Sequence, residues 1–243
     1  NALYAYQKAV EIKPDDPVFL YNLALVYEIK GQIDKAMESF KKVIYYKNED
    51  SNAFFSIGIL YSKTNDHKTA IKCFKKAIEY NYSDYFAHFY LAGEYKKTGE
   101  IDFALVEYRK VLELSPDYSW AYFNIAQIYW ELNRMDDAVL MLKKTIEKNP
   151  KDAEAYKLIA QILIKQGHLD EATEILTKAL DDIQNGDLYY LMAKIFELNE
   201  DFDSYKDSLE LAYEHKDSLT FNVGAVKNEI KQIEKSKHEK KQA

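Results

Sequence analysis

The feature that most constrains this chain is an internal repeat with a period of 34 residues. One series with this period consists of residue types that readily adopt the left-handed backbone conformation found at helix ends: Gly31, Asn65, Gly99, Asn133 and Gly167. A second series consists of small residues that let two helices approach closely: Ala36, Ala70, Ala104, Ala138 and Ala172. Series in the same phase predict a stack of similar units in place of one globular core.

Each unit reads as two amphipathic helices joined by a tight turn. Before the first turn, apolar residues follow the three- and four-residue spacing of a helix at Leu20, Leu23, Ala24 and Tyr27. After the turns, bulky residues recur with the same period at Phe40, Phe74, Tyr108, Leu142 and Leu176. Because the chain contains only 7 Gly and 4 Pro, turn-rich β structure is disfavoured and an all-α fold is expected.

The order of residue types in each unit resembles the tetratricopeptide repeat, in which a large residue, a small residue, Tyr, Ala, an aromatic residue and Pro recur. The resemblance covers nearly the whole chain, with units that begin at Pro17, Ser51, Tyr85, Ser119, Ala153 and Gly186. It implies a right-handed superhelical solenoid of antiparallel helix pairs. The last unit departs from the pattern because Tyr205 stands where Ala is expected, so we expect its two helices to pack differently.

This resemblance predicts four segments along the chain. Residues 1–16 form the second helix of an incomplete first repeat, residues 17–217 form six repeats, residues 218–236 form a C-terminal capping helix, and residues 237–243 form a charged, disordered tail. The capping helix is indicated by an apolar stripe at Leu219, Val223, Val226, Ile230 and Ile233. Stacked repeats need a shielded end, so capping is the favoured role, and pairing with another chain is the alternative. Asn1 and Ala2 are compatible with a cleavage scar, and the chain with a fragment of a longer protein.

Composition narrows the possible partners. The chain carries 33 Lys and Arg against 40 Asp and Glu, a net charge of -7, so no positive field attracts nucleic acid and none is expected as a partner. No stretch reaches the length of about 18 apolar residues that a membrane segment needs. The single cysteine, Cys73, cannot form an internal disulfide, which fits a reducing compartment such as the cytoplasm without requiring one.

In the tetratricopeptide family, the face of the first helix that points away from the core lines a concave groove where partner peptides bind. We predict a peptide-binding groove from the side chains in that helical phase: Tyr21, Asn22, Phe55, Phe86, Phe89, Tyr90, Trp120, Phe123, Asn124, Gln127 and Trp130. Aromatic rings dominate the central units, which favours an apolar or aromatic partner. Later units turn polar, with Glu154, Lys157, Asp187, Tyr190 and Lys194 among these positions. The alternative is that the rings pack against the neighbouring first helix.

The resemblance bears on two more specific binding features of the family. Asn22 and Asn124 stand where some family members place asparagines that bind the main chain of a peptide, although an exposed asparagine without a ligand is the alternative. The clamp for chaperone carboxylates needs Lys, Asn and Arg at positions that here hold Tyr21 and Leu25, then Ser56, then Phe86 and Tyr90. We therefore expect no binding of an acidic chaperone tail.

No catalytic, cofactor-binding or metal-binding residues are predicted. The five histidines are scattered and none forms a pair with zinc-motif spacing. His88 replaces a large core residue and is interpreted as a packed imidazole, and Cys73 lies beside core Phe74 and is interpreted as an inert thiol. We expect no enzyme activity and no cofactor.

The predicted function is a non-catalytic scaffold for protein interaction that binds a peptide or helical segment in its concave groove. Two alternatives remain open. One is a self-association module, built on the incomplete first repeat or the C-terminal stripe, although a monomer or weak homodimer is expected. The other is the regulatory repeat domain of a larger enzyme.

Overall fold

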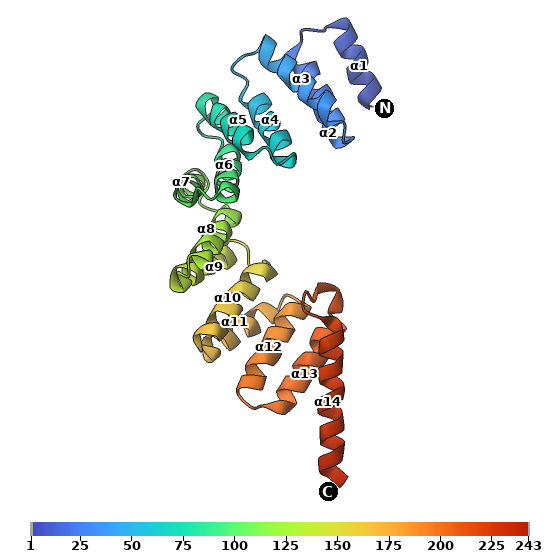
Figure 1. Cartoon of the computed structure of the whole chain (residues 1–243), viewed down its shortest axis with the longest axis vertical. Coiled ribbons are helices and arrows are strands. Elements are labelled where there is room, and N and C mark those ends of the chain that lie inside the picture. Colours follow the sequence, from blue (N-terminus) through green and yellow to red (C-terminus); the bar gives the residue numbers. More distant parts are fainter. Residues whose placement is uncertain (1, 243) are drawn as a thin grey trace. The chain divides into compact units, whose positions relative to one another are not determined.

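The computed structural model describes the backbone of residues 2–242 and the side chains of residues 2–235. Over these residues the chain is helical, with turns between the helices, and the predicted all-α class is confirmed (Figure 1). The helices are α1 (Ala2–Ile12), α2 (Pro17–Ile29), α3 (Ile33–Tyr46), α4 (Ser51–Lys63), α5 (His67–Tyr80), α6 (Tyr85–Thr98), α7 (Ile101–Leu114), α8 (Ser119–Glu131), α9 (Met135–Lys148), α10 (Ala153–Gln166), α11 (Leu169–Leu180), α12 (Gly186–Leu198), α13 (Phe202–Glu214) and α14 (Val223–Gln242).

The chain divides into two units, Asn1–Ala121 and Tyr122–Ala243, with the boundary inside α8. In the first unit, α2 pairs with α3, α4 with α5, and α6 with α7, and each pair packs on the next. In the second unit, α10 pairs with α11 and α12 with α13, and α9 packs on α10. Each unit is therefore a stack of helix pairs, as the period of 34 residues predicts.

The turns inside the pairs confirm the first repeated series. Gly31, Gly99 and Gly167 have φ angles of 70°, 81° and 80°, and Asn65 and Asn133 have φ angles of 60° and 58°. In the last pair the equivalent residue is Glu200, with a φ angle of 60°. A side chain with a Cβ atom is strained in this conformation unless it is Asn or Asp, so Glu200 is an exception to the pattern.

Aspartates cap the first helix of several pairs. The carboxylates of Asp16, Asp50, Asp84 and Asp152 accept hydrogen bonds from backbone N–H groups in the first turns of α2, α4, α6 and α10. These N–H groups have no partner within the helix, so the caps stabilise the helix starts by about 1 kcal/mol each.

The alanine series and the bulky residues that recur after the turns form the core. All five alanines of the second series are 0% exposed, and the bulky residues that follow them in the second helices are at most 1% exposed. Close packing is evident at Gly58, where an added Cβ would lie 2.7 Å from a ring carbon of Phe74. These contacts bury the apolar face that one helix pair cannot cover alone.

At the end of the second unit, α14 packs on α13. Leu219 and Val226 are 8% and 1% exposed, and the Tyr205 hydroxyl donates a hydrogen bond of 2.8 Å to a Glu229 carboxylate oxygen. Tyr205 occupies the alanine position and is buried among residues of α12, α13 and α14, so the last pair packs differently from the others.

The boundaries of this last helix differ from the predicted ones. The helix begins at Val223 because Asn222 accepts the Ala225 N–H, and it continues to Gln242 through the segment predicted to be a disordered tail. That segment is rich in Lys, Glu and Gln, which favour helix. Residue 243 lies outside the described residues. Within residues 2–242, no helix combines the length and the apolar character that crossing a bilayer requires.

Candidate functional site

The first unit carries six of the predicted groove aromatics: Tyr21 on α2 and a set of five on α4, α6 and the start of α8. We call Phe55, Phe86, Phe89, Tyr90 and Trp120 the aromatic surface. Phe86, Tyr90 and Trp120 are 44%, 40% and 54% exposed, whereas Phe55 and Phe89 are half-buried. The sequence allowed two interpretations, exposed groove residues or rings packed against the neighbouring first helix. Each describes part of the set, since some rings are exposed and others pack on neighbours.

The half-buried rings connect the surface to the core. Phe55 lies 5.3 Å from Tyr90 and 5.7 Å from the fully buried Phe74, measured between ring centroids. Phe89 lies 5.9 Å from Tyr90 and 5.6 Å from buried Tyr108. Edge-to-face contacts of this kind favour one arrangement of the rings. The aromatic surface is thus held in place by its own repeats.

Tyr118, which the sequence analysis did not single out, joins the same ring network. Its ring centroid lies 5.2 Å from that of Phe89, 5.9 Å from Phe86 and 5.3 Å from Tyr85. The pKa of Tyr118 is raised, mainly by burial and to a smaller extent by the neighbouring Tyr90 and Tyr85. Tyr118 precedes α8, so helical phase could not assign it to a face. Its position two residues before Trp120 could have indicated that it belongs to the same ring network.

Tyr21 and Asn22 lie on α2, at one wall of a cleft of about 310 Å³. The Tyr21 hydroxyl is 3.1 Å from the Ser56 hydroxyl, and the Asn22 amide donates to the Val18 carbonyl oxygen at 2.9 Å. The cleft is lined by Pro17, Val18, Tyr21 and Asn22 from α2, by Asn52 from α4, and by Lys47 and Asp50 between them. The amide N–H of Asn22 thus already has a partner in its own helix.

The remaining predicted groove residues belong to the second unit. Phe123, Asn124 and Gln127 are half-buried and Trp130 is 37% exposed. All four lie on α8 beyond the unit boundary. In the same unit, Asp187 occupies a groove position but is only 2% exposed.

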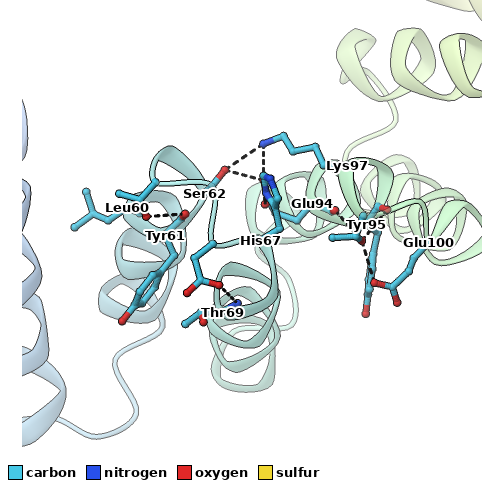
Figure 2. A network of polar contacts seen from close by, with 12 residues as sticks. Leu60, Tyr61, Ser62, His67, Thr69, Glu94, Tyr95, Lys97 and Glu100 are labelled. Atoms are coloured by element: carbon cyan, nitrogen blue, oxygen red, sulfur yellow. Dashed lines mark hydrogen bonds and ion pairs between the residues drawn. The ribbon is translucent and has the colours of Figure 1, made fainter.

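The first unit also buries a carboxylate, which Figure 2 shows with its polar contacts. Glu94 of α6 is 1% exposed and holds a position that is aliphatic in the other repeats: Val26, Leu60, Ile128, Ile162 and Ile195. Its oxygens lie 2.7 Å from the Ser62 hydroxyl, 2.7 Å from His67 Nδ1 and 2.6 Å from Lys97 Nζ.

These contacts determine the charge state of Glu94. Burial alone would raise the pKa of this carboxyl, but hydrogen bonds from Lys97, Ser62 and His67 outweigh burial and lower the pKa below its ordinary value. Because the three donors come from α4, the start of α5 and α6, the ionised carboxylate joins two successive repeats.

Of the other titratable groups that the sequence singled out, His88 is buried and Cys73 is half-buried. His88 is 3% exposed, with Nδ1 2.6 Å from Glu107 and Nε2 donating to the Tyr82 carbonyl oxygen at 3.1 Å. Burial raises the pKa of Cys73 to about 11, which keeps the thiol protonated and poorly reactive. Among the described residues, no group of three or more His, Cys, Asp or Glu is arranged to hold a metal ion.

Comparison with known families identifies the repeat. Family models described as "Tetratricopeptide repeat" match residues 95–162 and 137–195, residues 5–38 and residues 51–84. No curated protein matches the chain in sequence.

Solved structures share the fold. A crystal structure of MamA is 28% identical, with a TM-score of 0.58, and the match covers 63% of this chain and 89% of that one. YrrB, described as a TPR protein with an unusual peptide-binding site, is 21% identical, with a TM-score of 0.61 and coverage of 74% and 93%. The C-terminal part of a TPR repeat-containing protein from Cytophaga hutchinsonii is 13% identical, with a TM-score of 0.74 and coverage of 90% of both chains.

Proposed function

Because the chain belongs to the tetratricopeptide repeat family, whose models match more than half of it, we propose that it is a non-catalytic scaffold that binds a partner protein through the aromatic surface. The partner presents an extended peptide or a helical segment with apolar or aromatic side chains. The peptide-binding site for which YrrB is described supports this class of function.

The exposure of Phe86, Tyr90 and Trp120 is the observation that carries the proposal. Neighbouring exposed rings on a folded protein usually mark an interaction surface, and Trp and Tyr contribute strongly to binding energy. The rings are also held by contacts with Phe55, Phe89 and Tyr118. A partner therefore loses little affinity in ordering them.

The chemistry of the surface favours an uncharged ligand. All five side chains that define it are aromatic, and none of them is charged. These five side chains provide no positive charge to bind an acidic tail or a nucleic acid. A segment with Phe, Trp, Tyr or Leu side chains fits best.

A peptide-display selection tests the proposal. Peptides enriched on the wild-type protein should lose at least tenfold in affinity for the Phe86→Ala/Trp120→Ala variant, because two exposed anchors are removed. Tyr45→Ala is the matched control, since Tyr45 is 81% exposed on a second helix. Equal affinity for the double variant and the control would refute binding through the aromatic surface.

The C-terminal stripe gives the self-association alternative less support, and the incomplete first repeat stays open to it. Leu219 and Val226 of the stripe are buried within their own unit, and Val223, Ile230 and Ile233 are half-buried there. We expect a monomer in light scattering, and a tight dimer would support this alternative.

A further inference from the structure

In the last repeat, the chain itself covers the face of the first helix, α12, that points away from the core; we call this the first-helix face. The covering segment contains Thr220 and Phe221. Asp187 and Tyr190 of α12 hold the positions that Val18 and Tyr21 hold in α2, since the last unit starts one residue early. The Phe221 ring lies on Tyr190, with 4.3 Å between ring centroids and 33° between planes. Thr220 donates to Asp187 through its N–H at 2.6 Å and its hydroxyl at 2.7 Å.

The first repeat has the same tyrosine without the covering ring. Phe221 follows Asp187 by 34 residues, and the residue that follows Val18 by 34 is Asn52. Asn52 is short and exposed, and the cleft of about 310 Å³ lies where it meets Tyr21 and Val18. The cleft is therefore the open counterpart of the place that Phe221 fills.

We propose that this cleft binds an aromatic side chain from an extended segment of the partner, placed against Tyr21 as Phe221 is placed against Tyr190. This inference rests on the proposed function and adds a second subsite to it. Pro17, Val18 and Tyr21 supply apolar contact, and the carboxamides of Asn22 and Asn52 lie beside the ring.

The charges at the cleft favour an uncharged ring. Lys47 and Asp50 form an ion pair of 2.8 Å, so the cleft presents balanced charge. Val18 replaces Asp187, so the hydrogen bonds that Thr220 makes are not reproduced in the first repeat. Ring burial then provides most of the affinity, and one residue of the ligand should dominate it.

The chain itself provides the probe. A synthetic peptide with the sequence of residues 217–223 (DSLTFNV) is titrated into the full chain and followed by NMR. We expect shifts centred on Tyr21 and Asn22, and at least tenfold weaker binding of the same peptide with Ala in place of Phe. Absence of binding at millimolar peptide, or equal binding of both peptides, would overturn the proposal.

A variant that fills the cleft gives the matched test. Asn52→Phe places a ring where the last repeat has Phe221, and it should weaken binding of the probe at least tenfold. Lys68→Phe adds the same ring at an exposed position of α5 outside the cleft and should bind the probe as the wild type does. Asn52 and Lys68 are both exposed helix positions, so both variants should fold, which circular dichroism checks. Unchanged binding by Asn52→Phe would contradict the proposal.

This outcome is separable from that of the proposed function. If display-selected peptides need Phe86 and Trp120 but the probe does not bind, the aromatic surface stands and the subsite fails. If the probe binds at Tyr21 while selected peptides ignore Phe86 and Trp120, the subsite stands and the aromatic surface fails.

Discussion

In each pair, the first helix has a face that points away from the core. The two units differ in whether this face is left exposed or is covered by the chain itself. On α6 the face carries two rings that remain exposed, Phe86 and Tyr90, and the Phe55 ring on α4 is half-buried. On α10 and α12 the equivalent face is satisfied from within: Lys157 pairs with Glu154 at 2.8 Å and with Asp187 at 3.0 Å, and Phe221 covers Tyr190. The same backbone position can therefore be open to a partner or closed by the chain, and the choice depends on the residues placed there.

Each unit also buries a carboxylate, and the location differs. Glu94 is buried among donors of α4, α5 and α6, whereas Asp187 lies on the first-helix face and binds the segment before α14. Glu94 thus joins repeats to each other, and Asp187 holds a chain segment against the first-helix face. The following predictions test that contrast, beginning with the largest expected effect.

Removing the carboxylate on the closed face should have the largest effect. Asp187→Ala leaves the Thr220 N–H and hydroxyl without their acceptor and removes one of the two carboxylates that pair with Lys157, at a position that is 2% exposed. We expect a loss of about 3 kcal/mol in the free energy of unfolding of the second unit. Urea denaturation followed by hydrogen exchange measures it, with Asp182→Ala at an exposed position as control. A loss below about 1 kcal/mol would mean that Asp187 does not hold the segment.

Removing the charge of Glu94, which is buried among donors of α4, α5 and α6, should reduce stability less. Glu94→Gln keeps the shape but weakens three charge-assisted hydrogen bonds, so we expect a loss of about 2 kcal/mol at neutral pH. The pKa of Glu94 is lowered in the folded chain relative to its ordinary value of 4.5. The carboxylate therefore stabilises the fold above that value, and this contribution is lost as the pH falls through the lower folded pKa.

The difference between wild type and Glu94→Gln should accordingly shrink as the pH is lowered below 4.5. Unfolding by urea at neutral pH and at successively lower pH values measures it. A difference that stays constant with pH would show that Glu94 contributes through shape alone.

Uncovering the closed face should cost about 1.5 kcal/mol. Phe221→Ala removes a half-buried ring from Tyr190 and from the contacts of α14. Thermal unfolding measures the loss, and Phe202→Ala, at a position that is 58% exposed, is the control. If the two variants lose equal stability, the ring does not hold the face closed.

The smallest expected effect is a gain. Glu200 has a φ angle of 60° where the other pairs use Gly or Asn. Glu200→Gly should stabilise the second unit by up to about 1 kcal/mol, because strain in the folded chain exceeds the added freedom of the unfolded chain. Glu200→Ala retains the strain and should not stabilise. Equal stability of the Gly and Ala variants would contradict this explanation.

The sequence predicted what depends on the repeat and missed what depends on single contacts. Turn residues such as Gly99 and core residues such as Ala104 could be assigned because the same requirement recurs in each unit. Tyr118 was missed since it lies before a helix, where helical phase gives no face. The burial of Asp187 was also missed, because nothing in its own repeat shows that Thr220 returns to bind it.

The core position of Glu94 shows a further limit. The periodicity places an aliphatic residue there, and the three donors that make a carboxylate acceptable come from residues 32, 27 and 3 positions away. Such an arrangement is seen only when side chains are placed in space. For the same reason the exposure of Phe86, as against that of Phe89, could not be read from helical phase.

Hydrogen exchange of the full chain with and without a display-selected peptide tests the central contrast most directly. The account predicts added protection in α2, α4 and α6 of the first unit and none in α12 of the second. Protection confined to α10 and α12, with α4 and α6 unchanged, would contradict it.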